Sequence, residues 1–251
     1  PEKSLAFIKI LRPSNLLMVM LTQFALQYKV IVPLAGTHVL LDGVLFPLFT
    51  VVTALVAGSG YIINDIFDYQ ADKLNKPEKC YIPEFITTKQ AWIYFFILVL
   101  AGFIIAAYIA VTTQTIFYLG LYPLSVILLY LYSARFKSTI LAGNILVSLF
   151  IACVTGVVFL AQSLYPGQDR TTAHILTELC ALIMTLSFLL NLIREIVKDL
   201  EDIEGDSATG LKTIATGMPA QRIKIWLNAL IICTLILVIV WLWHSAMASG
   251  F

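Results

Sequence analysis

Long apolar segments separated by short polar ones dominate the chain. Hydropathy read in windows of about 19 residues predicts seven segments long enough to cross a hydrocarbon core about 30 Å thick. A lone strand cannot satisfy its backbone in lipid, and the alternation of a membrane barrel is missing, so the segments are expected to be helices. The fold class is therefore an all-α, polytopic transmembrane helical bundle. The predicted spans are Pro13–Ala35, Leu41–Ile63, Ala91–Val111, Thr115–Tyr132, Leu141–Leu160, Leu176–Ile193 and Ile223–Trp243.

The composition supports a membrane protein. Of the 251 residues, 60% are apolar and only 12% are charged, whereas a soluble domain is about one-quarter charged. A net charge of +1 gives no reason to expect a nucleic-acid partner. The four cysteines are far apart without a C-x-x-C pair, and three fall in apolar runs, so they are interpreted as small buried hydrophobes.

The basic residues predict the orientation. Fourteen of the 16 Lys and Arg fall on one face, leaving Lys29 and Arg170 on the other. By the positive-inside rule, the crowded face and the amino terminus are cytoplasmic. The first span is about 23 residues long, has no clear cleavage pattern and precedes six more spans, so it is interpreted as a retained anchor. We expect an integral protein of the cell (inner) membrane.

The acidic residues gather on that same face. Twelve of the 15 Asp and Glu share it, although acidic residues contribute little to topology and so need another reason to cluster there. The three histidines, His38, His174 and His244, lie near the opposite face. A histidine base at the charged face is therefore not expected.

Two acidic motifs share one spacing. The second span ends in N-D-I-F-D-Y-Q-A-D from Asn64 to Asp72, and the sixth ends in K-D-L-E-D-I-E-G-D from Lys198 to Asp206. Both contain D-x-x-D-x-x-x-D, and positions i, i+3 and i+7 share one face of a helix. Both spans are even-numbered, so they end on the same side. The sequence predicts two acidic edges, each on one helix, at one face of the membrane.

Such a cluster needs compensating cations. Mg²⁺ prefers hard oxygen ligands and is commonly held by one or two carboxylates together with substrate phosphates, which predicts a diphosphate substrate. A single D-x-x-D is more often solvated surface, but duplication beside Asn64, Asn191 and Arg194 at membrane depth favours a functional site. Lysines and arginines in the same loops are candidates for the remaining phosphate charge. They are Lys73, Lys76, Lys79, Arg135, Lys137, Arg194, Lys198 and Lys212.

A third segment, Tyr132-Ser-Ala-Arg135-Phe-Lys137, closes the fourth span on the same face. By itself it is more typical of an aromatic and basic interface anchor than of a site, and its position beside the other two motifs makes the two interpretations about equal. Three motifs together resemble the UbiA superfamily of intramembrane prenyltransferases. They are the N-D-x-x-D-x-x-x-D motif with Asn75-Lys76-Pro77-Glu78, the second D-x-x-D-x-x-x-D motif and this Y-S-x-x-x-K segment.

The resemblance implies nine helices around a central cavity that opens laterally to lipid and is capped by the motifs. Seven spans are predicted here and the chain begins at Pro1. We therefore expect residues 1–251 to form a single prenyltransferase domain that lacks the last two helices of the family, as a processed or truncated form.

The resemblance also implies the site. Asp65, Asp68, Asp199 and Asp202 would be the catalytic carboxylates holding two Mg²⁺ ions against the diphosphate. The full set of implied metal ligands is Asn64, Asp65, Asp68, Asp72, Asp199, Asp202 and Asp206. The implied substrate-binding residues are Asn15, Lys76, Tyr132, Arg135, Lys137, Asn191, Arg194, Lys198 and Lys212. For Asn15, a helix-cap or packing role is equally open.

The second motif, followed by Gly210-Leu-Lys212-Thr213, is most similar to the branch that makes archaeal-type ether lipids. That branch implies a geranylgeranyl donor and a geranylgeranylglyceryl phosphate acceptor. An aromatic acceptor of the quinone, tocopherol or chlorophyll pathways is the alternative. The first loop departs from the family at Cys80–Glu84, where an arginine and proline pair is frequent, so one phosphate contact is expected to be lost or supplied elsewhere.

Other functional classes remain open. A cation-coupled transporter would carry its charges near the bilayer midplane, whereas these motifs lie at span ends. A transferase acting on nucleotide-activated alcohols would be expected to carry its acidic residues on one continuous stretch, and a structural scaffold would not need two acidic edges.

Overall fold

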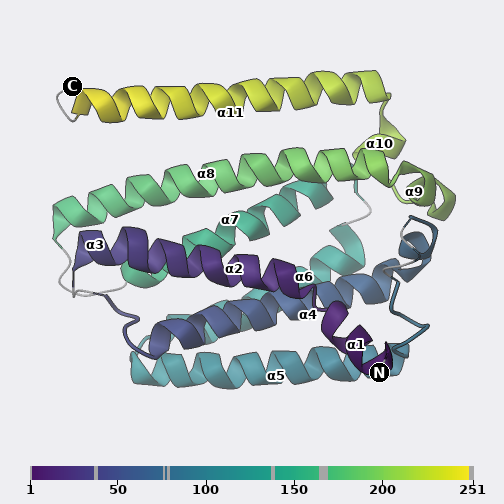
Figure 1. Ribbon diagram of the computed structural model, residues 1–251, viewed down its shortest axis with the longest axis horizontal. Helices are drawn as coiled ribbons and strands as arrows, with labels where there is room; N and C mark the ends of the chain where they lie inside the picture. Colours follow the sequence, from purple (N-terminus) through teal and green to yellow (C-terminus); the bar gives the residue numbers. More distant parts are fainter. Residues whose placement is uncertain are drawn as a thin grey trace.

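The computed structural model describes residues 2–36, 39–75, 77, 80–136, 139–163 and 169–248, and their regular structure is helical throughout (Figure 1). The first half contains α1 (Glu2–Lys9), α2 (Pro13–Leu26), the π-helix η1 (Gln27–Ile31), α3 (Val32–Ala35), α4 (Leu45–Asn75) and α5 (Thr88–Thr112). The second half contains α6 (Phe117–Leu131), the π-helix η3 (Tyr132–Phe136), α7 (Ala142–Ser163), α8 (Arg170–Glu201), α9 (Ile203–Thr209), α10 (Ile214–Gly217) and α11 (Ala220–Ala248).

The seven predicted spans are confirmed as helices long and apolar enough to cross a membrane. On α5, Ile93, Ile97, Leu100 and Ile104 are all more than half exposed. Their spacing of three or four residues places them on one face of the helix. An exposed apolar stripe of this kind suits a helix that faces lipid. The chain is an integral membrane protein.

Two helices are longer than the membrane requires. α4 has 31 residues and α8 has 32, and at 1.5 Å per residue each is about 46–48 Å long, against a hydrocarbon core of about 30 Å. Their carboxyl-terminal turns can therefore extend beyond the apolar layer, and both acidic motifs begin in these turns.

The first span is not one uniform helix. The π-helix η1 interrupts it and precedes Pro33, which is in the first turn of α3. Proline has no N–H to donate to the carbonyl four residues earlier, and a π segment is one way for a helix to absorb the lost bond. This irregularity was not predicted.

Two local cores fix the ends of the long helices. Ile10, which directly follows α1, packs with Ile62 and Ile63 of α4, and with Ile82 and Ile86 of the following loop. At the other motif, Leu192 and Ile196 of α8 pack with Ile214, Ala215 and Ile223. Each core thus holds the backbone beside one motif.

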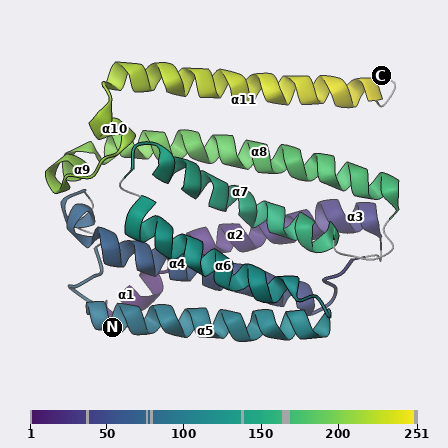
Figure 2. The same ribbon diagram turned by 180° about the vertical axis from the view of Figure 1, so that it is seen from behind.

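The outermost helix is α11. It packs along α8 at the edge of the bundle (Figures 1 and 2), and only 6% of its most apolar window is buried. Residues of α2, α4, α5, α6, α7 and α8 enclose a cavity on the inner side of α8.

Candidate functional site

A cavity of about 940 Å³ runs through the bundle. One continuous face of α4 lines it, from Phe49 through Thr53, Val56 and Gly60 to Asn64. These positions recur every three or four residues, so a single helical face leads from the interior of the bundle to the first acidic motif. Asn64 was predicted as a site residue and lies at the end of this face.

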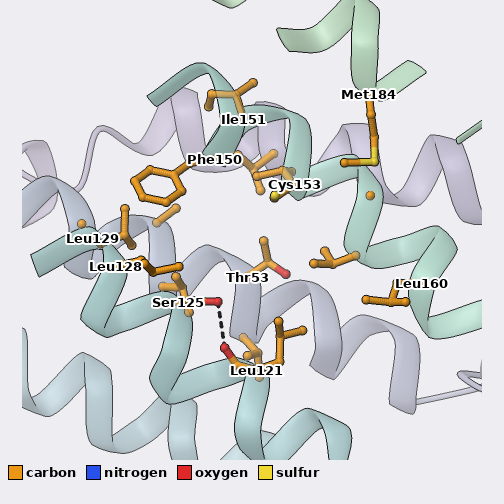
Figure 3. Close-up of a pocket in the computed structure, with 18 of the residues that line it drawn as sticks. Thr53, Leu121, Ser125, Leu128, Leu129, Phe150, Ile151, Cys153, Leu160 and Met184 are labelled. Atoms are coloured by element: carbon orange, nitrogen blue, oxygen red, sulfur yellow. Dashed lines mark hydrogen bonds between the residues drawn. The ribbon is translucent and has the colours of Figure 1, made fainter. Parts of the chain in front are cut away.

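The cavity has an apolar body. Figure 3 shows Leu121 and Leu128 of α6 with Phe150, Cys153 and Leu160 of α7 along its walls. The hydroxyl of Ser125 in the same region donates to the carbonyl of Leu121 at 2.9 Å, as the dashed line marks. This body suits a long hydrocarbon chain.

Charged groups gather at one end of the cavity. Arg12, Arg194, Glu195 and Lys198 are the charged side chains that line it within the described part of the chain. They lie beside the carboxyl-terminal turns of α4 and α8. We call this the motif end, defined by the segments 64–72 and 198–206.

The first motif has the predicted form. α4 continues unbroken to Asn75, so Asp65, Asp68 and Asp72 lie at i, i+3 and i+7 of one helix. Asp65 and Asp68 are buried, with 8% and 7% exposure. Asp72 is half-buried. The acidic edge therefore faces protein rather than open solvent.

The second motif does not lie on one helix, so the prediction of a continuous edge was wrong there. α8 ends at Glu201, and Asp202 has φ −94° and ψ 7° between α8 and α9. Asp favours helix boundaries, and acidic groups in the first turn of α9 favour a helix start. Asp199 therefore lies on α8, and Asp206 lies on α9, where it is buried.

The bend brings the two motifs together. α9 contacts α4, and Figures 1 and 2 both show it beside the carboxyl-terminal turns of that helix. The prediction that both acidic segments lie at the same end of the bundle agrees with this arrangement.

Protein groups already bind the leading aspartate of each motif. A guanidinium nitrogen of Arg12 lies 2.6 Å from Asp65 Oδ1, and its carbon lies 4.9 Å from the centre of the Tyr61 ring. The amide of Asn144 on α7 donates to Asp199 Oδ2 at 2.9 Å. Neither partner was predicted, because each lies more than 50 residues from its aspartate, and no local pattern signals such a pairing.

The thiol of Cys80 lies near the carboxylates of the first motif. Burial raises the pKa of this thiol, and the carboxylates of Asp72, Glu84 and Asp65 add to the effect, while Lys73 opposes it. Burial is the larger cause, and the contribution of the three carboxylates shows that negative charge lies near this thiol. Negative charge at this end favours a bound cation.

Apart from Asn191, the predicted substrate-binding residues separate into three groups. Asn15, Tyr132, Arg194 and Lys198 line the cavity. Arg135 and Lys212 are exposed on η3 and on the loop after α9. Lys76 and Lys137 lie outside the described residues.

Asn191, a predicted substrate-binding residue, contacts α7. It is buried, its amide donates to Ser148 Oγ at 3.4 Å, and it is absent from the described cavity lining. By contrast, Glu195 was not predicted, yet it lines the cavity and accepts from Arg194 at 2.9 Å. Little in the sequence indicated Glu195, because this residue lies outside the repeated D-x-x-D-x-x-x-D motif.

The donor set suits magnesium bound together with a diphosphate. Within the described residues, no group of three or more His, Cys, Asp or Glu is arranged to hold a metal ion. Mg²⁺ rarely uses an all-protein cage and commonly takes one or two carboxylates, water and substrate phosphates. Asn64 and Lys198, the first residues of the two motif segments, line the cavity, and the motif aspartates follow them directly in the sequence. Carboxylates from two segments beside one cavity fit that requirement.

Comparison with known proteins agrees with the motif resemblance. Residues 18–251 match the model of the UbiA prenyltransferase family. The chain is 35% identical to the digeranylgeranylglyceryl phosphate synthase of Methanopyrus kandleri over 209 residues, which cover 83% of this chain and 68% of that protein. The synthase of Thermococcus sibiricus is also 35% identical, over 83% of this chain and 66% of that protein. The chain thus spans about two thirds of their length.

Two solved structures share the fold. One, from work on digeranylgeranylglyceryl phosphate synthase in membranes, has a TM-score of 0.66 at 23% identity and covers 94% of this chain and 76% of that one. The other, a UbiA homolog from Archaeoglobus fulgidus bound to GPP and Mg²⁺, has a TM-score of 0.61 at 21% identity, covering 92% and 76%.

Proposed function

The chain belongs to the UbiA prenyltransferase family, and from this premise we propose that it transfers a geranylgeranyl group from geranylgeranyl diphosphate to geranylgeranylglyceryl phosphate in a Mg²⁺-dependent reaction. The names of the similar synthases support this acceptor. The neighbour bound to GPP and Mg²⁺ supports a prenyl diphosphate donor and magnesium.

One observation carries the proposal. The apolar cavity of about 940 Å³ ends in a charged mouth at which two acidic segments, 134 residues apart in sequence, meet through the contact of α9 with α4. A prenyl diphosphate is an apolar chain with a highly charged head, so its two parts match the two parts of the cavity.

The proposed metal ligands are Asn64, Asp65, Asp68, Asp72, Asp199, Asp202 and Asp206. Magnesium, when bound, would neutralise the negative charge that develops on the diphosphate as the bond between the allylic carbon and oxygen breaks. Arg194 and Lys198 line the mouth and would bind diphosphate oxygens by charge-assisted hydrogen bonds.

The chain's own apolar residues protect the reacting carbon. Leu128 and Phe150 line the cavity body, and Tyr132 lines it nearer the mouth, with its ring 6.0 Å from that of Phe150 between centroids. The Tyr132 ring would offer its electron-rich face to developing positive charge. Apolar walls would exclude the water that would otherwise capture an allylic cation.

We assign the remaining predicted substrate contacts to the acceptor. Asn15 would position the acceptor from α2, and Arg135 and Lys212 would attract its phosphate from outside the mouth. Lys76 and Lys137 stay predictions of the same kind. The amino terminus and the motif end would face the cytoplasm, in accord with the positive-inside rule.

The arrangement of charge disfavours a cation transporter. Transporter ion sites usually lie near the bilayer midplane on broken helices. The charged residues among the described cavity lining, Arg12, Arg194, Glu195 and Lys198, all lie at the motif end. This distribution favours a ligand with one charged head.

The proposal is tested with membranes that contain the full chain. They are incubated with Mg²⁺, geranylgeranyl diphosphate and, separately, geranylgeranylglyceryl phosphate, 4-hydroxybenzoate, homogentisate or dihydroxynaphthoate. We expect product only with the glyceryl phosphate and none in EDTA. Asp68→Asn and Asp202→Asn, which keep side-chain size but remove charge, should each lower the rate at least about 100-fold, as loss of one electrostatic stabiliser does.

A matched control is available. Asp42 is exposed, and its Oδ1 accepts from the N–H of Gly43 at 2.6 Å, at the opposite end of α4. Asp42→Asn should keep the wild-type rate. Product formation that survives EDTA or both motif substitutions would reject the metal-held diphosphate, and product with an aromatic acceptor alone would reject the proposed acceptor.

A further inference from the structure

Arg12 reaches the charged mouth from the short link between α1 and α2. Its side chain lines the cavity, bonds to Asp65 Oδ1 at 2.6 Å and lies over the ring of Tyr61. The side chain of Arg12 is 38% exposed, whereas that of Asp65 is 11% exposed. The guanidinium is therefore bound to a buried carboxylate while part of it still reaches the open cavity.

The backbone holds Arg12 in an unusual conformation. Its φ of 51° and ψ of 63° are left-handed, and its side chain does not cap α2. Non-glycine residues seldom adopt this conformation, so the surrounding contacts must maintain it. Ala6 of α1 and Ile10 of the link share a buried apolar cluster with Ile62 and Ile63 of α4, which fixes the link beside Asp65.

This contact competes with the proposed role of Asp65. A carboxylate that already neutralises a guanidinium at 2.6 Å binds a divalent cation less well, because the two positive groups repel one another at short range. A bound prenyl diphosphate changes this balance, since its oxygens attract both metal and guanidinium. Arginine matches phosphate geometry through paired N–H donors.

We propose that Arg12 is a displaceable counter-ion of Asp65: it holds the carboxylate while the mouth is empty, and turns to the diphosphate when metal and donor bind together. The inference rests on the proposed function and deepens it. Its consequence is thermodynamic coupling, in which the donor strengthens metal binding and the metal strengthens donor binding by the same factor. Metal alone binds weakly, which limits unproductive occupation of the site.

Arg194 provides a comparison within the same mouth. It also lines the cavity, but it forms an ion pair with Glu195 at 2.9 Å, and Glu195 lies outside the two D-x-x-D-x-x-x-D motifs. Removing Arg194 should weaken donor binding without strengthening metal binding. Arg12 should behave differently because its removal exposes a motif carboxylate.

The test measures binding on the purified full chain in lipid nanodiscs. Electron paramagnetic resonance follows Mn²⁺ as the metal probe, and geranylgeranyl thiolodiphosphate serves as a donor analogue. Arg12→Gln should bind Mn²⁺ alone about tenfold more tightly than wild type and, at saturating Mn²⁺, should bind the analogue about tenfold more weakly, within the usual range of coupling between sites. Lys9→Gln removes the same charge from an exposed position on α1 and should change neither affinity.

Arg12→Lys is the second variant and carries the test if Arg12→Gln does not fold. It keeps the positive charge but loses the paired donors, so its Mn²⁺ affinity should stay near wild type while its analogue affinity falls. Unchanged analogue affinity in Arg12→Lys would overturn the inference. In Arg12→Gln, equal losses of Mn²⁺ affinity and analogue affinity, or an unchanged Mn²⁺ affinity, would also overturn it. Failure of wild type to bind Mn²⁺ or analogue would instead reject the proposed function.

Discussion

Individual charged residues at the motif end are satisfied by partners from distant segments. Asp65 of α4 is bound by Arg12, and Asp199 of α8 by Asn144 of α7. Such contacts offset part of the free-energy cost of burying these side chains, which would be high without a partner. The carboxylates are thus positioned before any ligand arrives.

The Asn144 contact leads to a stability prediction. Asn144→Leu removes the amide that donates to Asp199 at 2.9 Å, and loss of a hydrogen bond to a charged group costs about 1.5–3 kcal/mol. Thermal unfolding in detergent should show a lower Tm. Asn228→Leu, at an exposed site on α11, is the control and should stay within about 0.5 kcal/mol of wild type. Equal stability of the two variants would show that the contact contributes nothing.

The residue types of the site were predictable, but their partners were not. Repeated D-x-x-D-x-x-x-D spacing is a local signal, so Asp65 and Asp202 could be found directly in the sequence. Arg12 appeared only as one of many basic residues near the cytoplasmic face. Its role depends on the docking of α1 against α4, a tertiary contact that a single sequence does not encode locally.

At the scale of elements, the spans were predictable because about 20 consecutive apolar residues are themselves the signal. The bend at Asp202 was missed because the spacing of its motif fits a helix equally well. In the structure, Asp202 ends α8 and α9 turns against α4. The break matters because it brings part of the second motif to the end of the helix that carries the first.

Close packing of α5 against α6 gives the element-scale prediction. A Cβ on Gly102 would lie 2.8 Å from Tyr122 ring carbons, and that ring is held because Tyr122 Oη donates to the Val99 carbonyl at 2.8 Å. Gly102→Ala should therefore destabilise the protein by about 1–3 kcal/mol through overpacking.

Gly120 supplies the matched control on α6. A Cβ there meets nothing within 4 Å, so Gly120→Ala should be neutral or stabilising by up to about 1 kcal/mol. Thermal unfolding of both variants in the same detergent measures the difference. A Gly102→Ala protein as stable as Gly120→Ala would contradict the described packing of α5 on α6.

At the scale of the whole molecule, the bundle separates a charged end from an apolar interior. The basic residues predict that this end faces the cytoplasm, but the helix arrangement by itself does not distinguish the two sides of a membrane. Two exposed positions allow the orientation to be tested: Ser207 on α9 and Thr171 at the start of α8. α8 has 32 residues, so its ends are about 48 Å apart.

Orientation can be measured with a membrane-impermeant maleimide. In sealed inside-out vesicles, Ser207→Cys should be labelled above the wild-type background and Thr171→Cys should not. Vesicles of the opposite sidedness should give the reverse pattern. Labelling of Thr171→Cys alone in inside-out vesicles would place the motif end outside the cytoplasm.

The central claim is that carboxylates from both acidic segments hold one diphosphate through metal. It is tested most directly by a crystal structure of the full chain with Mn²⁺ and geranylgeranyl thiolodiphosphate, in which anomalous scattering locates the manganese. We expect manganese at the motif end, coordinated by the diphosphate and by aspartates from both 65–72 and 199–206, with the prenyl chain in the cavity. Manganese bound to only one segment, or a diphosphate bound elsewhere, would contradict the account.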